Sequence, residues 1–145
     1  MLNRAGLVIA LTKQDRVEIE KRLKAMPDSD PGARLNRRLA QFIDAPAGVA
    51  GEIRHLASAA NYPEKALLAQ WAAYYHEPEL SLDLLAEAAP NLSLPSVLWQ
   101  PQMRDVRKLP AFKEVVRRMG LVDYWRTYRW SDFCHPLSKD DFVCG

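Results

Sequence analysis

Two series of prolines recur along the chain with the same spacing, and this repeat limits the architecture more than any other feature of the sequence. Pro31, Pro63 and Pro95 form one series, and Pro46, Pro78 and Pro110 form the other, each with a period of 32 residues. Proline is favoured at the first position of a helix, where its missing N–H group and fixed φ cost nothing. The two series therefore predict two helix starts in each repeat.

Large apolar side chains recur at fixed distances after the first proline series and support the repeat independently. They stand four, eight and eleven residues after each proline, a spacing that places them on one face of an α-helix. The set comprises Leu35, Leu39, Phe42, Leu67, Trp71, Tyr74, Trp99, Met103 and Val106. We therefore predict a B helix after each proline of the first series and an A helix after each proline of the second.

The A helices have apolar stripes of their own. On the second and third A helices the stripes consist of Val49, Ile53, Leu56, Leu84, Leu85 and Ala88. The first A helix has no proline, but the repeat predicts its start near Gln14, with Val17 and Leu23 facing inward. Asp15 then places negative charge in the first turn, where the helix dipole favours it.

Alanine occupies one repeat position near the end of every A helix, where a small side chain lets neighbouring helices approach closely. These residues are Ala25, Ala57 and Ala89. Extending the repeat backwards predicts a B-type helix over residues 2–11, with Leu7 and Leu11 inward. This helix has no A helix before it and exposes Leu2, Val8 and Ile9, so its surface is a candidate for homodimerisation or for a missing upstream domain.

The repeat pattern degrades towards the C-terminus, as expected of a cap. Pro101 falls inside the third B helix and must kink or end it. The helix after Pro110 ends at Gly120, a residue suited to a left-handed cap. Its apolar residues are Phe112, Val115, Val116 and Met119. A short helix over 122–128 follows, and no segment of the chain has the alternation that predicts a strand.

The predicted fold class is all-α, a right-handed superhelix of antiparallel helix pairs. Its parts are a half-repeat at 1–12, repeats at 13–45, 46–77 and 78–109, capping helices at 110–130 and an irregular tail at 131–145.

Paired helices with this period resemble the tetratricopeptide-like solenoids, although the usual Gly and Tyr of the first helix are missing from every copy. A sharper resemblance covers residues 110–134. Here Pro110-Ala-Phe112, Gly120-Leu121, Tyr124-Trp125 and Trp130-Ser-Asp-Phe-Cys134 look like the closing segment of many bacterial tetratricopeptide-type proteins. That segment often ends a repeat region preceded by an effector domain, for which this chain has no room. The resemblance implies protein recognition along a concave surface and no catalytic residues.

Catalytic and cofactor motifs are missing from the sequence. It contains no glycine-rich phosphate loop, no G-x-S-x-G elbow and no H-E-x-x-H pair. We therefore expect neither enzymatic activity nor a cofactor. The short apolar run at the N-terminus is a poor signal peptide and too short to span a bilayer, so the expected location is cytoplasmic.

The sequence contains only one cluster of residue types that commonly bind metals. It consists of Cys134, His135, Asp140, Asp141 and Cys144. Free thiols, a disulfide and a metal site all remain open from sequence. Reduced thiols are favoured because no secretion signal precedes them, and the cysteine spacing fits structural zinc badly. Of the other histidines, we interpret His55 as a partly buried polar residue and His76 as a charge at a helix end.

The partner-binding surface follows from the A helices, which line the concave wall of such a superhelix. Its predicted residues are Glu20, Glu52, His55, Asp83 and Glu87. Their mostly acidic character suits a basic peptide or protein partner, and no membrane partner is expected.

A nucleic-acid-associated regulator is the alternative function. The net charge is only +2, but the C-terminal part of the chain is basic and the middle acidic. Residues 124–130 interleave aromatic and arginine side chains, a pattern that can stack bases and neutralise phosphates. Helical spacing favours packing of Tyr124, Trp125 and Tyr128 against the last repeat instead. The basic patch predicted on this cap consists of Arg117, Arg118, Arg126 and Arg129.

Overall fold

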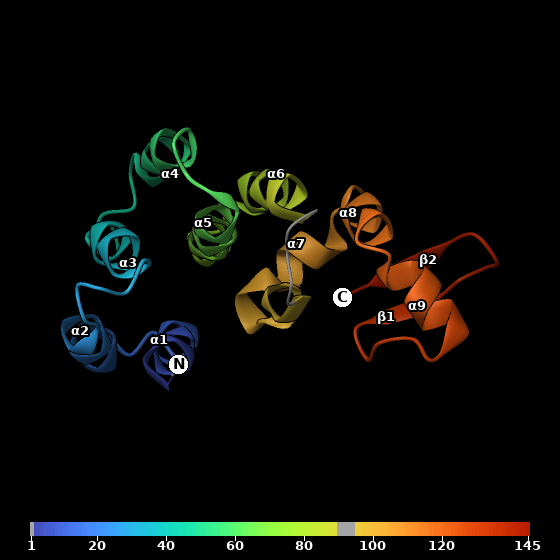
Figure 1. Ribbon diagram of the computed structural model, residues 1–145, viewed down its shortest axis with the longest axis horizontal. Coiled ribbons are helices and arrows are strands. Elements are labelled where there is room, and N and C mark those ends of the chain that lie inside the picture. Colours follow the sequence, from blue (N-terminus) through green and yellow to red (C-terminus); the bar gives the residue numbers. More distant parts are fainter. Residues whose placement is uncertain (1, 90–94) are drawn as a thin grey trace. The chain divides into compact units, whose positions relative to one another are not determined.

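The computed structural model describes residues 2–89 and 95–145, with side chains from residue 6 onward and none described for 90–95. This part of the chain is mostly helical and divides into two compact units, residues 1–55 and 56–145. The first unit contains α1 (Leu2–Thr12), α2 (Arg16–Ala25), α3 (Ala33–Ala40) and α4 (Val49–Ala57), the last of which reaches the unit boundary (Figure 1).

The second unit begins with two long helices, α5 (Tyr62–Tyr74) and α6 (Pro78–Ala88), which pack side by side (Figure 1). Shorter elements follow: the 3₁₀ helices Pro95–Trp99 and Pro101–Met103, then α7 (Arg104–Lys108), α8 (Phe112–Arg118) and α9 (Leu121–Thr127). The chain ends in an antiparallel pair of strands, β1 (Cys134–Pro136) and β2 (Phe142–Cys144).

The proline repeat predicted the helices well. A helix lies at or just after each of Pro31, Pro46, Pro63, Pro78 and Pro110. The third B helix is broken as predicted: one 3₁₀ turn ends at Trp99, a second begins at Pro101, and α-helix starts only at Arg104. The predicted B-type helix at the N-terminus corresponds to α1.

The hairpins α1–α2 and α5–α6 use the same turn. Gln14 and His76 both adopt a left-handed conformation, with φ of 54° and 60°. The next backbone N–H group bonds back to Ala10 in the first turn and to Ala72 in the second. This pattern is a Schellman motif, which satisfies carbonyl groups at the end of the leading helix.

The turns at Gln14 and His76 lie 62 residues apart, whereas two proline repeats span 64 residues. The first A helix therefore begins two residues later than the proline repeat predicts. The expected start near Gln14 is wrong, because α2 begins at Arg16. Asp15 precedes the helix as its N-cap, and its side chain accepts a hydrogen bond from the backbone N–H of Glu18.

Two further predictions fail. Val17 is 79% exposed, and the inward position belongs to Ile19. Ala25 is exposed, Ala57 half-buried and Ala89 buried, so the three alanines share no common environment.

Most other predicted core positions are buried. The buried ones are Leu7, Leu11, Leu23, Leu35, Leu39, Val49, Ile53, Trp71, Leu84, Leu85, Ala88, Met103 and Val106. Phe42, Leu56, Leu67, Tyr74 and Trp99 are half-buried. Of the apolar residues expected on the surface of α1, Ile9 is exposed and Val8 half-buried, whereas the side chain of Leu2 lies outside the described residues.

The interface between α5 and α6 also contains a buried polar contact. Ser81 is fully buried, and its hydroxyl donates a hydrogen bond of 2.8 Å to the carbonyl oxygen of Ala69. Trp71 packs there too, with the rings of Tyr74 and Tyr75 within 6 Å of its own. A buried hydroxyl needs such a partner, so this bond helps to fix how the two helices meet.

The C-terminal cap follows the prediction as far as residue 128. Phe112, Val115 and Val116 are buried and Met119 is half-buried. Gly120 has φ of 73°, in the left-handed region, and α9 begins directly after it, one residue earlier than predicted.

The tail at 131–145 is not irregular, and the chain is therefore not purely α-helical. Strands β1 and β2 pair in register, with Cys134 opposite Cys144 and Pro136 opposite Phe142. The hairpin escaped prediction because each strand has only three residues, too few to establish an alternating pattern.

We expect Gly120→Ala to lower the free energy of unfolding by about 1 kcal/mol, because an L residue is strained at its positive φ. Nothing lies within 4 Å of a Cβ built there, so strain alone decides the result. Gly51→Ala is the matched control: it lies inside α4 with equally open space and should stabilise the protein by about 0.5–1 kcal/mol. Urea denaturation of both variants measures the difference, and equal effects would contradict the conformational argument.

Candidate functional site

Aromatic side chains gather around Phe142, a fully buried residue of β2 in the C-terminal cap. Its ring centroid lies 6.2 Å from that of Trp125 on α9 and 5.5 Å from that of Trp130. The cations of Lys113 and Arg117 lie 5.8 and 5.2 Å from the same centroid. Such contacts between cations and ring faces are favourable, so Phe142 joins α8, α9 and the hairpin.

The hairpin is tied to the helices by polar contacts as well. Arg117 and Arg126 donate hydrogen bonds of 3.2 and 2.9 Å to the carbonyl oxygens of residues 140 and 139. Lys113 forms a 2.6 Å ion pair with Asp141. The hydrogen bond from Lys113 lowers the pKa of Asp141 most, and a hydrogen bond from the backbone of Phe142 lowers it further. The loop between the strands is therefore anchored to both α8 and α9.

A disulfide joins Cys134 to Cys144 across the two strands. Both cysteines are buried. The structure therefore selects the disulfide from the three alternatives left open by sequence and differs from the reduced state favoured there. Since each sulfur is bonded to the other, neither is a thiolate available to a metal. In the residues that the structure describes, no three His, Cys, Asp or Glu side chains are grouped to hold a metal ion.

Beside this cluster lies an open pocket with a volume of about 450 Å³, which we call the aromatic pocket. Its lining consists of Trp99, Tyr124, Tyr128, Arg129, Trp130, Ser131, Asp132 and Phe133. The rings of Tyr124 on α9 and of Tyr128, the C-cap of this helix, lie 4.8 Å apart. Trp99 and Phe133 stack almost in parallel, with centroids 5.5 Å apart. Two ring pairs from separate segments therefore supply half of the lining residues.

Arg107 on α7 holds one of these ring pairs in place. Its guanidinium is buried, donates hydrogen bonds of 2.9 and 3.1 Å to the carbonyl oxygens of Leu98 and Gln100, and lies 4.7 Å from the ring centroid of Phe133. Burial lowers the pKa of Arg107. The two carbonyl groups flank Trp99, so Arg107 fixes the backbone on both sides of Trp99 and the ring stacked on it.

The polar groups of the pocket are few. Arg129 and Asp132 form an ion pair of 3.3 Å at its rim, where both side chains are more than four-fifths exposed. The hydroxyl of Ser131 is buried and has no hydrogen-bond partner in the described part of the chain. A buried hydroxyl without a partner costs free energy, and this oxygen is closed off from solvent.

The predicted packing of the tyrosines on α9 is wrong. Trp125 is buried, as predicted, but Tyr124 and Tyr128 are 58% and 73% exposed. Tyrosines four residues apart mark one face of a helix, but the sequence does not show whether that face meets protein or solvent. The other lining residues come from a broken helix and an irregular segment, for which sequence periodicity gives no signal.

The five residues predicted to bind a partner divide between the two units. Glu20, Glu52 and His55 belong to the first, and Asp83 and Glu87 to the second. Glu20, Asp83 and His55 are exposed, so His55 is not the partly buried residue expected, whereas His76 follows the end of α5 as predicted.

Two of the predicted acidic side chains are already paired with cations of the protein. Arg38 donates a 2.7 Å hydrogen bond to Glu52 and so lowers its pKa, to which His55 adds a smaller attraction. Glu87 pairs with Lys65. These pairs reduce the negative charge that either carboxylate offers to a partner.

The four arginines of the predicted basic patch also bind the protein itself. Arg117 and Arg126 anchor the hairpin loop, and Arg118 donates a 3.0 Å hydrogen bond to the carbonyl oxygen of residue 86. Arg129 pairs with Asp132. All four remain exposed, but each has a structural partner.

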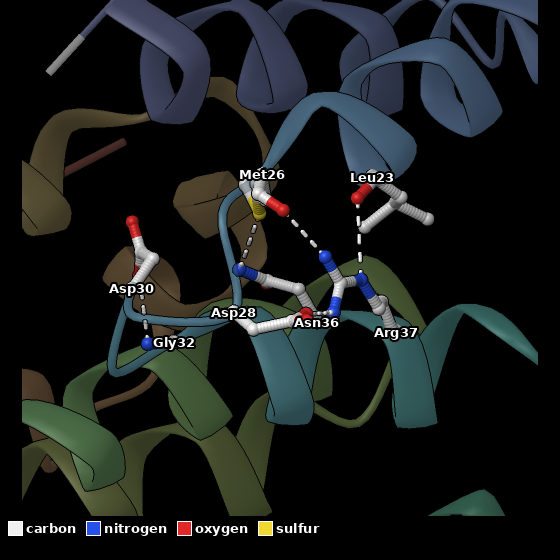
Figure 2. Close-up of polar contacts among 7 residues, drawn as sticks. All are labelled: Leu23, Met26, Asp28, Asp30, Gly32, Asn36 and Arg37. Carbon is white, nitrogen blue, oxygen red and sulfur yellow. Dashed lines mark hydrogen bonds and ion pairs between the residues drawn. The ribbon is translucent and has the colours of Figure 1, made fainter.

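A second polar cluster joins α2 to α3 in the first unit. Figure 2 shows Arg37 directed at the end of α2, where it donates hydrogen bonds to the carbonyl oxygens of Leu23 and Met26 and to the carboxylate of Asp28. The amide of Asn36 contacts the sulfur of Met26 at 3.7 Å. Because Arg37 donates to backbone carbonyl groups at the end of α2, we assign this cluster a structural role.

Comparisons with known protein families, curated proteins and solved structures returned no match. Within residues 2–89 and 95–145, no helix combines the length and apolar character needed to cross a membrane.

Replacing both cysteines, as Cys134→Ser/Cys144→Ser, should lower the free energy of unfolding by about 2–3 kcal/mol, because the disulfide restricts the unfolded chain. Thiol titration of the denatured wild-type protein, purified without reductant, should detect no free thiol, and reduction should reveal both. Two free thiols before reduction would contradict the bonded state.

The Lys113–Asp141 pair should make part of the stability depend on pH. The folded-state pKa of Asp141 lies below its ordinary value of 3.8, so the pair contributes stability above that value and loses it as pH falls through the folded pKa. We expect Asp141→Asn to be less stable than wild type at pH 7, with the gap narrowing as pH falls below 3.8. Asp140→Asn is the control, because Asp140 is exposed and forms no ion pair among the described residues. Chemical denaturation across pH measures both, and the same trend in Asp140→Asn would point to general charge effects.

Proposed function

We propose that this protein is a non-catalytic scaffold that binds a protein partner through a peptide segment. The observation that carries the proposal is the distribution of exposed apolar side chains. Of the large apolar residues exposed in the described part of the chain, most lie in the cap: Tyr124, Tyr128, Phe133, Leu137 and Val143. Clusters of this kind mark interaction sites on soluble proteins, and aromatic residues contribute most of the binding energy at such sites.

The helical part of the chain suits a scaffold of stacked hairpins. Two hairpins share one turn geometry, and most of the apolar positions predicted from the repeat pattern are buried. We propose that the hairpins form a right-handed tetratricopeptide-like superhelix, and that the exposed carboxylates of Glu20 in the first unit and Asp83 in the second are available to basic groups of a partner. The acidic groups would then add charge selectivity to the apolar contacts of the cap.

A nucleic-acid-associated role through the basic cap is the second candidate, favoured by the exposure of Arg117, Arg118, Arg126 and Arg129 beside aromatic rings. The structural partners of these arginines weaken it. Salt separates the two candidates, because affinity based on phosphate contacts falls steeply between low and moderate salt whereas apolar contacts change little.

A pull-down from lysate of the source cell tests the proposal, run at two salt concentrations with and without nuclease. We expect a protein partner that survives nuclease and moderate salt and is lost with the variant Tyr124→Ala/Tyr128→Ala. Tyr62→Ala is the matched control, because Tyr62 is also about half exposed but lies on α5, away from the cap. Loss of all partners on nuclease treatment, or equal capture by both variants, would overturn the proposal.

A further inference from the structure

The walls of the aromatic pocket are shaped for a ligand with flat or ridged apolar faces. Tyr124 lies on α9 and Tyr128 is the C-cap of that helix, whereas Trp99 and Phe133 come from a 3₁₀ turn and the segment before β1. Arg107 holds the second ring pair in place. Rings held in this way lose little entropy when a ligand binds against them.

The pocket offers hydrogen-bond donors that the protein does not use. Within the described residues, no hydrogen bond involves the hydroxyl groups of Tyr124 and Tyr128 or the indole N–H groups of Trp99 and Trp130. An indole N–H group donates only, and a hydroxyl can donate. The complementary ligand therefore presents several acceptors and few donors.

The charge of the pocket is balanced. Its lining contains one cation and one anion, Arg129 and Asp132, and these pair with each other. A nucleic-acid strand would bring one phosphate per nucleotide to a surface with no net positive charge. The charge balance therefore favours a neutral ligand over a polyanion.

We propose that the aromatic pocket binds an extended, proline-rich segment of the partner protein, an inference that rests on the proposed function. A polyproline II segment meets all three requirements. It presents ridged apolar rings, its backbone carbonyl groups are free of internal hydrogen bonds, and its prolines carry neither N–H groups nor charge. Aromatic-lined grooves recognise such segments because their conformation is already ordered before binding.

Titration of the full chain with a blocked ten-proline peptide, followed by the indole N–H signals in NMR spectra, tests this directly. The signals of Trp99 and Trp130 should shift in a saturable manner with a dissociation constant of about 1 mM or tighter. The signal of Trp71, buried in the second unit's α5–α6 hairpin, should stay in place. A blocked ten-residue Gly/Ser peptide should produce no saturable shift.

Single variants locate the contacts. We expect Tyr128→Ala to weaken binding of the proline peptide about tenfold, because an aromatic anchor is lost. Tyr62→Ala should bind as wild type, and the far-ultraviolet circular dichroism of each variant shows that it folds.

The proposal is overturned if the ten-proline peptide causes no shift, if the Gly/Ser peptide binds equally well, or if Tyr128→Ala binds as tightly as wild type. A ten-thymidine strand that shifts the same two indole signals more strongly, with affinity that collapses as salt rises, would assign the pocket to single-stranded nucleic acid instead.

The outcomes also separate this inference from the function on which it rests. Suppose that the proline peptide fails to bind but the partner is still lost with Tyr124→Ala/Tyr128→Ala in the pull-down. The scaffold function then stands and the ligand class is wrong. If the peptide binds and no partner depends on these tyrosines, the pocket is correctly assigned and the scaffold function fails.

Discussion

The burial of Phe142 is the interaction on which the C-terminal cap depends. Its ring is enclosed by Trp125 and Trp130 and faced by the cations of Lys113 and Arg117, so one side chain holds α8, α9 and β2 together. Seven short elements follow α6 in the described part of the chain, and none is long enough to be stable alone. These elements are therefore stabilised by their tertiary contacts with one another, and Phe142 contributes both ring–ring and cation–ring contacts.

The same packing sets the geometry of the aromatic pocket. The disulfide fixes the start of β1 directly after Phe133, and the backbone of residue 145 donates a hydrogen bond to the carbonyl oxygen of Phe133. Arg107 fixes Trp99 on the other side. The pocket is thus built by segments with little regular structure, and their side chains are positioned by covalent, ionic and aromatic contacts. Loss of the disulfide should loosen the pocket before it affects the α5–α6 hairpin.

The sequence predicted the helical part of the fold because prolines and apolar stripes act locally. It placed Gln14 and Val17 wrongly because the Schellman turn before α2 starts that helix two residues later than the proline repeat implies. It missed the hairpin, whose strands are too short for periodicity, and it left the state of Cys134 open. The aromatic pocket was beyond sequence reasoning, since two tyrosines four residues apart look the same whether a helix face is covered or open.

The arginines of the cap show why composition alone misleads about function. A basic, aromatic segment such as 124–130 suggests nucleic acid, yet Arg117 and Arg126 use their donors to hold the hairpin loop and Arg129 pairs with an acid. The exposed surface of the cap instead contains aromatic rings and hydrogen-bond donors that have no partner within the described residues. Charge brings molecules together over distance, whereas rings and donors select what stays bound. The cap is therefore better equipped to choose among neutral chain segments than to attract a polyanion.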